Sequence, residues 1–168
     1  STPSASTKPK LNNSKDMSLP VNVGSAALMR HKWSGEVKQK LTERFHLRGF
    51  RQNQLEAINA TLGGKDAFVL MPTGGGKSLC YQLPAIIRSG TTRGITIVIS
   101  PLLSLMQDQV DHLQKLGIQA FVINSEVPQS YKNMVMSGLE ERVPEDFVEL
   151  LYVTPRSEER RVGKECME

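Results

Sequence analysis

The chain has 168 residues, 39% of them hydrophobic, which is enough for one ordinary domain with a closed apolar core. Its formal net charge is +4, and all of this excess lies in residues 1–33, where five basic side chains accompany a single acid. Bulk charge therefore gives no indication that the remaining residues bind nucleic acid. No apolar run approaches the length of a membrane span and no signal-peptide pattern begins the chain, so we expect a soluble intracellular protein.

The cysteines and histidines show no metal-binding or disulfide pattern. Cys80 and Cys166 lie far apart and outside any C-x-x-C pairing. The three histidines, at positions 31, 46 and 112, have no ligand spacing. We predict neither a zinc site nor a disulfide framework.

Residues 1–33 are rich in Ser, Thr, Pro, Asn and Lys and hold no lasting periodicity, which predicts a disordered basic tail. Apolar residues at helical spacing then predict a first helix around residues 37–45. A second helix is predicted over residues 53–62, before Gly63 and Gly64 end it.

Strand and helix patterns alternate through the rest of the chain. Strands are predicted at residues 67–71, 95–100, 120–123 and 148–153, and helices at residues 77–87, 102–116 and 129–141. Such alternation predicts an α/β fold with a parallel sheet and helices on both faces. The ligand crevice is expected at the carboxyl ends of the strands.

The segment Thr73-Gly74-Gly75-Gly76-Lys77-Ser78 lies between the first predicted strand and its helix, as a phosphate-binding loop does. Glycines allow backbone N–H groups to surround phosphate oxygens. Lys77 would contact the β- and γ-phosphates, and the Ser78 hydroxyl would coordinate Mg²⁺. The strict motif begins with glycine where this chain has Met71. A mobile glycine turn with a surface lysine is the alternative interpretation.

The P-T-G-G-G-K-S form resembles motif I of superfamily 2 helicases, and the flanking segments resemble RecQ helicases. These are F-H-L-R-G-F-R-Q-N-Q at residues 45–54 and L-C-Y-Q-L-P-A at residues 79–85. The first resembles motif 0, which implies that Gln54 reads the adenine edge while Arg51 and Leu47 embrace the ring. A side-chain amide can donate to N7 and accept from the N6 amine, which favours ATP over GTP. His46 stands where the family has glycine, and a polar turn between two helices is the alternative.

Two further segments resemble the DNA-contacting motifs of the same family. S-P-L-L-S-L-M-Q-D-Q at residues 100–109 resembles motif Ia, which implies contact of Ser100, Pro101 and Ser104 with the phosphates of single-stranded DNA. A helix N-terminus with a free hydroxyl can hold a phosphate without net charge. Helix capping by Ser100, with Pro101 at the first helical position, is a compatible alternative. L-L-Y-V-T-P at residues 150–155 resembles the start of motif Ib and adds Thr154.

The resemblance covers residues 32–155 and is strongest to the Bloom-type eukaryotic branch of the RecQ family, in its fungal form. It implies that residues 34–155 are a partial RecA-like, P-loop NTPase lobe that ends before the Walker B strand. Residues 156–168 resemble no helicase segment. We interpret them as foreign sequence similar to a translated sequencing adapter, and genomic resequencing that returned them in frame would refute this.

The family resemblance implies an ATP-dependent 3′–5′ DNA helicase of the nucleus that acts in repair and recombination. ATP and Mg²⁺ would be its cofactors, and single-stranded or branched DNA its partner. The acidic D-E-A-H motif that completes the Mg²⁺ shell in this family does not occur in the 168 residues, so we expect them not to turn over ATP or unwind DNA alone. Two alternatives stay open: a P-loop ATPase without helicase activity, and a binding product without catalysis.

Overall fold

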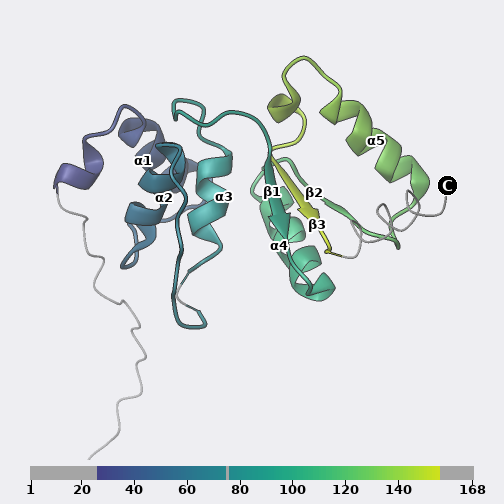
Figure 1. The fold of residues 1–168 in the computed structure, drawn as a ribbon, viewed down its shortest axis with the longest axis horizontal. Helices are drawn as coiled ribbons and strands as arrows, with labels where there is room; N and C mark the ends of the chain where they lie inside the picture. The colour runs from purple at the N-terminus through teal and green to yellow at the C-terminus, as the bar shows by residue number, and fades with distance from the viewer. Residues whose placement is uncertain (1–25, 75, 156–168) are drawn as a thin grey trace, which may run out of the picture.

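The computed structural model describes residues 26–74 and 76–155, and Figure 1 shows them as two halves side by side. The helical half contains η1 (Ala26–Met29), α1 (Ser34–Glu43), α2 (Gln54–Leu62) and α3 (Leu79–Ala85). The sheet half contains β1 (Thr96–Ile99), α4 (Leu103–Lys115), β2 (Ala120–Ile123), α5 (Gln129–Leu139), η2 (Pro144–Asp146) and β3 (Leu150–Val153). All five predicted α-helices are present, with boundaries that differ by a few residues.

The three strands form a parallel sheet in the order β1-β3-β2. β3 is central, and its Leu150 is level with Thr96 of β1 and Ala120 of β2. The strands consist mostly of β-branched and other apolar residues, which pack well on a pleated surface. Three of the four predicted strands and their parallel arrangement are therefore confirmed.

Helices cover both faces of this sheet, as the alternating pattern predicted. α4 packs its apolar stripe of Met106, Val110 and Leu113 into the cluster that contains Leu150 and Tyr152 of β3. α5 contributes to a second cluster with alternate strand residues, in which Val135 meets Leu151, Phe121 and Ile123. Because side chains alternate across a strand, each face of β3 contributes to a different cluster.

The folded body begins before residue 34, where we expected the basic tail to end. Trp33 is only 6% exposed, and its Nε1 donates to Oδ1 of Asn59 at 2.9 Å. Nδ2 of Asn59 in turn donates to the backbone oxygen of Leu28 at 2.9 Å. The large apolar area of the indole and its satisfied N–H outweigh the polar composition around it, so residues 26–33 pack on α2. The rest of the expected tail, residues 1–25, lies outside the described residues.

The predicted strand at residues 67–71 is not formed. These residues have no strand partner among the described residues, and Phe68 and Leu70 are 91% and 79% exposed. A strand requires a neighbour that accepts and donates its backbone hydrogen bonds. The sheet ends at β1 on this side, so the apolar pattern has the composition of a strand without its pairing.

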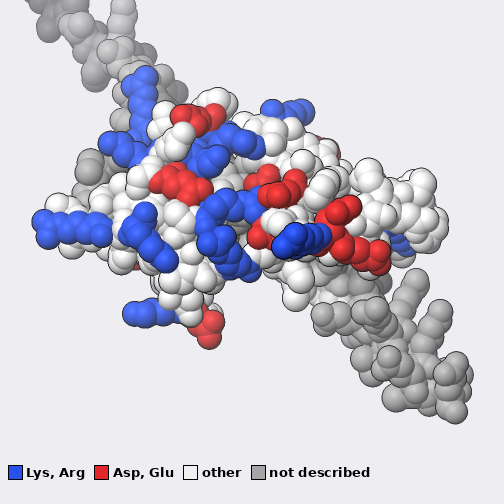
Figure 2. Space-filling model, turned by 90° about the horizontal axis from the view of Figure 1, so that it is seen from above, with Lys and Arg blue, Asp and Glu red and all other residues white. Residues whose placement is uncertain are grey.

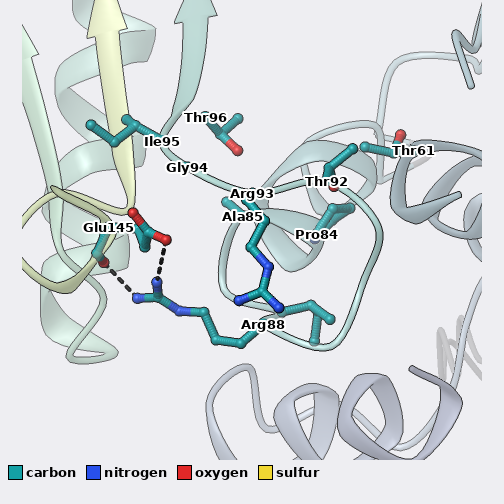
Figure 3. A pocket seen from close by; sticks show the side chains of 11 residues that line it. Thr61, Pro84, Ala85, Arg88, Thr92, Arg93, Gly94, Ile95, Thr96 and Glu145 are labelled. Atoms are coloured by element: carbon teal, nitrogen blue, oxygen red, sulfur yellow. Dashed lines mark hydrogen bonds and ion pairs between the residues drawn. The ribbon is translucent and has the colours of Figure 1, made fainter. Parts of the chain in front are cut away.

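Arg88, just after α3, ties the helical half to the sheet half (Figure 3). Its guanidinium lies 3.6 Å from the Glu145 carboxylate and 3.5 Å from that of Asp146, both in η2. Its backbone N–H donates to the Glu36 carboxylate of α1 at 3.0 Å. Arg88 also borders a cavity of about 130 Å³ between the end of α3 and the start of β1. None of the predicted site residues lines this cavity.

The surface seen from above Figure 1 carries lysines and arginines interspersed with aspartates and glutamates (Figure 2). This face therefore offers no continuous basic path along which nucleic-acid phosphates could lie. No helix in the described part of the chain is both long and apolar enough to cross a membrane.

Candidate nucleotide and DNA site

The glycine-rich loop keeps the conformation that its residues predict. Gly74 and Gly76 have φ angles of 79° and 84°, a left-handed backbone that glycine adopts without steric cost. Gly75 lies outside the described residues. Thr73 and Lys77 are exposed, and Ser78 is half-buried immediately before α3. The loop is thus placed between an extended segment and a helix, with its lysine accessible to a ligand.

Side chains of the predicted base-binding segment hold this loop. Nε2 of Gln54 donates to the backbone oxygen of Gly76 at 2.9 Å, and the Arg51 guanidinium donates to that of Gly74. A Cβ on Gly76 would lie 2.3 Å from Nε2 of Gln54, so only glycine permits this approach. The structure therefore brings the base-binding segment predicted at residues 45–54 into contact with the phosphate loop.

The oxygen and the nitrogen of the Gln54 amide each have one backbone partner in this conformation. Its Oε1 accepts from the backbone N–H of Arg51 at 2.7 Å while its Nε2 serves Gly76, and the residue is 3% exposed. An amide that reads adenine needs a free donor and a free acceptor. Because Gln54 is almost fully buried, its amide has to move from this position to reach a base.

Leu47, the third predicted base contact, lies in the turn between α1 and α2. Its side chain is 42% exposed, and its backbone N–H donates to the oxygen of Leu41 at 3.1 Å. The preceding residue, His46, has a φ of 55°, so the position where the family has glycine is left-handed here. The segment is a turn between two helices, as the alternative interpretation had it, and it also carries side chains that hold the phosphate loop.

Lys77 borders a cavity of about 340 Å³, a volume within the range of ligand pockets. The lining residues are Ala57 and Thr61 of α2, Ala67 and Val69 of the extended segment, and Lys77, Cys80 and Tyr81. Cys80 and Tyr81 were not among the site residues predicted from the sequence. Their spacing of three and four residues after Lys77 could have indicated a shared helix face. Burial raises the pKa of the Cys80 thiol, which favours its neutral form.

The predicted DNA contacts converge at the carboxyl ends of two neighbouring strands. Ser100 follows β1 and Thr154 follows β3, and these strands pair up to Ile99 and Val153. The backbone N–H of Ser100 donates to the oxygen of Val153 at 3.1 Å. Parallel pairing therefore places Ser100 beside the end of β3, where Thr154 follows.

Ser100 does not cap α4, contrary to one interpretation of the sequence. The helix begins at Leu103, its N-cap position is Leu102, and Pro101 is outside it. Oγ of Ser100 accepts instead from the backbone N–H of Leu102 at 3.4 Å, a local turn that competes with a capping bond. Pro101 and Ser104 are exposed, so they are accessible to a ligand.

The phosphate loop and this turn lie on the same side of the molecule. The loop between α2 and α3 extends to the lower side of Figure 1, toward which β1 and β3 also point. In open parallel sheets this side is where ligands bind.

The donor set at the loop suits Mg²⁺ delivered with a nucleotide better than a resident metal. Among the described residues, no group of three or more His, Cys, Asp or Glu side chains could hold a metal ion. Mg²⁺ commonly keeps several waters and binds through one or two protein oxygens and the phosphates of its substrate. The half-buried Ser78 hydroxyl is an oxygen that could hold such a Mg²⁺.

Comparison with known proteins agrees with this architecture. The family described as DEAD/DEAH box helicase matches residues 51–162, which is most of the chain. The chain therefore belongs to the DEAD/DEAH box helicase family, and its parallel sheet between helices is consistent with a RecA-like lobe. The match runs past residue 155, so the predicted boundary of the foreign segment stays a prediction.

The similar proteins are RecQ-type helicases, as the motifs indicated. An ATP-dependent DNA helicase of Schizosaccharomyces pombe is 54% identical over 150 residues, which cover 88% of this chain and 11% of that protein. An ATP-dependent helicase of Saccharomyces cerevisiae is 56% identical over 127 residues, 73% of this chain and 8% of that protein. The RecQ-like DNA helicase BLM of Xenopus laevis is 48% identical over 122 residues, again 73% and 8%. The chain thus spans about a tenth of the length of these relatives.

Proposed function

We propose that this chain supplies the ATP-binding and part of the DNA-binding surface of a RecQ-type, ATP-dependent 3′–5′ DNA helicase that acts in nuclear DNA repair and recombination. The observation that supports the proposal is the contact between the base-binding segment and the phosphate loop. In this contact the side chains of Arg51 and Gln54 donate to the backbone oxygens of Gly74 and Gly76. A base-reading amide beside a phosphate loop is the arrangement that a nucleotide requires. The proposed reaction, ATP-dependent unwinding of DNA, is taken from the names of the similar proteins.

The nucleotide is bound along the loop. Backbone N–H groups of residues 73–76 surround the triphosphate, and the ammonium of Lys77 contacts its β- and γ-phosphates. The Ser78 hydroxyl completes the shell of the Mg²⁺ that accompanies ATP. Gln54 releases Gly76 and turns its amide to the adenine edge, while Arg51 and Leu47 pack on the ring.

Single-stranded DNA is bound at the ends of β1 and β3. Hydroxyls and backbone N–H groups can hold phosphate oxygens without a net charge on the protein. This suits the sheet half, because none of its predicted DNA contacts is a charged side chain. Ser100, Pro101, Ser104 and Thr154 make these contacts, and they fix the path of the strand without reading its sequence.

The proposal is tested by titrating the intact protein and its Lys77→Ala variant with fluorescent ATP and Mg²⁺. A hydrogen bond to a charged group contributes about 1.5–3 kcal/mol, so we expect the variant to lose at least about tenfold in affinity. Lys38→Ala, at an exposed lysine of α1, is the matched control and should bind as the wild type does. Equal affinity of all three proteins for ATP would refute the proposed phosphate site at Lys77.

Two further measurements separate the alternatives. Stimulation of ATP hydrolysis by single-stranded DNA in the intact protein distinguishes a helicase motor from a P-loop ATPase that is unrelated to DNA. We also infer that residues 1–168 alone do not turn over ATP, because they lack the acidic D-E-A-H pair. Lys77-dependent turnover by the 168-residue chain would contradict that inference.

A further inference from the structure

Four polar side chains meet where α3, α4 and β3 pack together. They are Tyr81 and Gln82 of α3, Gln109 of α4 and Tyr152 of β3, here called the Tyr–Gln cluster. Oε1 of Gln109 accepts from the hydroxyls of both Tyr81 and Tyr152, each at 2.8 Å. Nε2 of Gln82 donates to the Tyr152 hydroxyl at 3.2 Å and lies 3.4 Å from Oε1 of Gln109. One carbonyl oxygen thus joins three elements.

The cluster is polar within an apolar core. Tyr152 and Gln82 are 1% and 5% exposed, and Tyr152 belongs to the same core cluster as Leu83 and Val110. Burying amides and phenols costs free energy unless each is hydrogen-bonded, so packing alone would favour apolar residues here. Burial also raises the pKa of Tyr81 and Tyr152, which keeps both hydroxyls protonated. The two phenols therefore continue to donate to Gln109 at any physiological pH.

Each member stands close in the sequence to a proposed ligand contact. Tyr81 is four residues after Lys77 and borders the same cavity. Gln109 is five residues after Ser104 in α4, and Tyr152 is two residues before Thr154. The cluster therefore lies between the phosphate loop and the two chain segments that end at the DNA surface.

We propose that Gln109 is a positioning residue that, through Tyr81, Gln82 and Tyr152, couples nucleotide occupancy of the phosphate loop to DNA binding at the ends of β1 and β3. A displacement of α3 on phosphate binding moves the two donors that this helix gives to Gln109, of which Gln82 also donates to Tyr152. Hydrogen bonds are directional, so α4 and β3 must follow this displacement, whereas apolar contacts would permit sliding. This inference rests on the proposed function of the two sites.

The test measures the affinity of the intact protein for a non-hydrolysable fluorescent ATP analogue with Mg²⁺, with and without saturating single-stranded DNA. The ratio of the two affinities is the coupling, which is typically about 5- to 150-fold in proteins with linked sites. Gln109→Leu and Tyr152→Phe remove the shared acceptor and one donor at nearly constant volume. We expect both to bring the ratio to about one fifth of its wild-type value or lower, because one hydrogen bond contributes about 1 kcal/mol, which is about fivefold in an equilibrium constant. Affinity for the analogue without DNA should stay close to that of the wild type.

Two controls separate coupling from packing. Tyr131→Phe removes a hydroxyl of α5 on the opposite face of the sheet, where it accepts from the backbone N–H of Val122 at 3.2 Å, and should keep the wild-type ratio. Gln109→Glu keeps an oxygen acceptor for both phenols and should retain more of the ratio than Gln109→Leu. Equal loss in the Leu and Glu variants, or the same loss in Tyr131→Phe, would overturn the inference.

The outcomes also separate this inference from the proposed function. If DNA does not change the affinity of the wild type for the analogue, the linkage between the two sites fails together with the inference. If the wild type is coupled and both cluster variants keep its ratio, the two sites stand and the role of Gln109 is refuted. Loss of coupling in both cluster variants with unchanged analogue binding supports it.

Discussion

The phosphate loop and the turn after β1 both lead from an extended segment into a helix, yet they are held in different ways. The loop is held by side chains, because Arg51 and Gln54 donate to the carbonyls of Gly74 and Gly76. The turn at Ser100 follows a strand that pairs with β3, and its backbone N–H donates to Val153. One turn therefore depends on a few side-chain bonds and the other on the sheet.

This difference bears on how each turn meets its ligand. The side chains that hold the phosphate loop are the same ones proposed to read the base, so we expect nucleotide binding to move them from the positions they have in this structure. The observed affinity for ATP then includes the cost of that rearrangement. The turn after β1 requires no such exchange of side-chain partners. Substitutions in the helical half should thus change ATP binding more than DNA binding, and the following predictions test this.

The largest effect is expected from Trp33→Ala. Trp33 supports α2, which carries Gln54, through its bond to Asn59 and its burial in the core. Truncation of a buried aromatic residue costs about 3–5 kcal/mol, so we expect the free energy of unfolding to fall by about 3 kcal/mol. His31→Ala is the matched control, because its exposed ring stacks on Trp33 at a centroid distance of 4.7 Å. Urea unfolding of the intact protein measures both. A similar small loss of unfolding free energy in the two variants would mean that Trp33 belongs to the tail and not to the folded core.

Gln54→Ala should change nucleotide selectivity. The variant loses both adenine hydrogen bonds and also the bond that restrains Gly76, so its affinity for ATP reflects two opposed changes. The ratio of ATP to GTP affinity reports the base contact alone, and we expect it to fall about thirtyfold, since each of the two proposed adenine hydrogen bonds contributes about 1 kcal/mol.

The control for this selectivity experiment is Gln129→Ala. Gln129 is exposed on α5 in the other half, where its side chain donates to Asn133 at 2.9 Å. The control should leave both nucleotide selectivity and DNA affinity unchanged. If Gln54→Ala weakened DNA binding as strongly as ATP binding, the distinction between the two turns would be lost.

The elements that sequence alone predicted are those that depend on near neighbours in the chain. The stripe of Met106, Val110 and Leu113 at helical spacing gave α4, and the parallel sheet followed from the alternation of strands and helices. The left-handed Gly74 and Gly76 were likewise implied by a local motif. These features could be predicted without knowing which residues far apart in the sequence are in contact.

The remaining features depend on partners that are far away in the sequence. An apolar run such as residues 67–71 has the composition of a strand, but its pairing depends on another segment, and none of the described residues supplies one. The burial of Trp33 depends on Asn59, 26 residues later, and the bond from Gln54 to Gly76 spans 22 residues. The Tyr–Gln cluster joins residues up to 70 apart. A pattern within a short stretch of sequence cannot predict contacts between residues so far apart.

The link between α1 and the end of α3 gives a pH dependence. Burial raises the pKa of Glu36, but hydrogen bonds from the Ser89 hydroxyl and from the backbone N–H groups of Arg88 and Ser89 outweigh it and hold the pKa below its usual 4.5. A carboxyl with a lowered pKa stabilises the fold above its unfolded-state pKa, and this contribution is lost as the pH falls through the folded-state value.

Glu36→Gln tests that link. We expect the variant to lose about 1 kcal/mol of unfolding free energy at neutral pH, a small value because the carboxylate is partly exposed. The difference from the wild type should disappear as the pH falls below 4.5. Glu43→Gln is the control, since this exposed carboxylate accepts from the side chain of Gln39 one helical turn away. Unfolding curves at several pH values measure the effect. A difference that grew at low pH would have the wrong sign.

The smallest effect, and the one that addresses the base-binding turn most directly, is expected from His46→Gly. A left-handed backbone costs a non-glycine residue about 1–2 kcal/mol, and His46 has a φ of 55°. Glycine removes this cost but gives the unfolded chain more freedom, so the net gain in unfolding free energy should be about 0.5 kcal/mol. Arg48→Gly, two residues later at an exposed position without a positive φ, has no strain to relieve and should lose a similar amount. Opposite signs at these two positions would show that the backbone is strained at His46 and not at Arg48, whereas destabilisation by both glycines would mean that the left-handed conformation at residue 46 is not the one populated in solution.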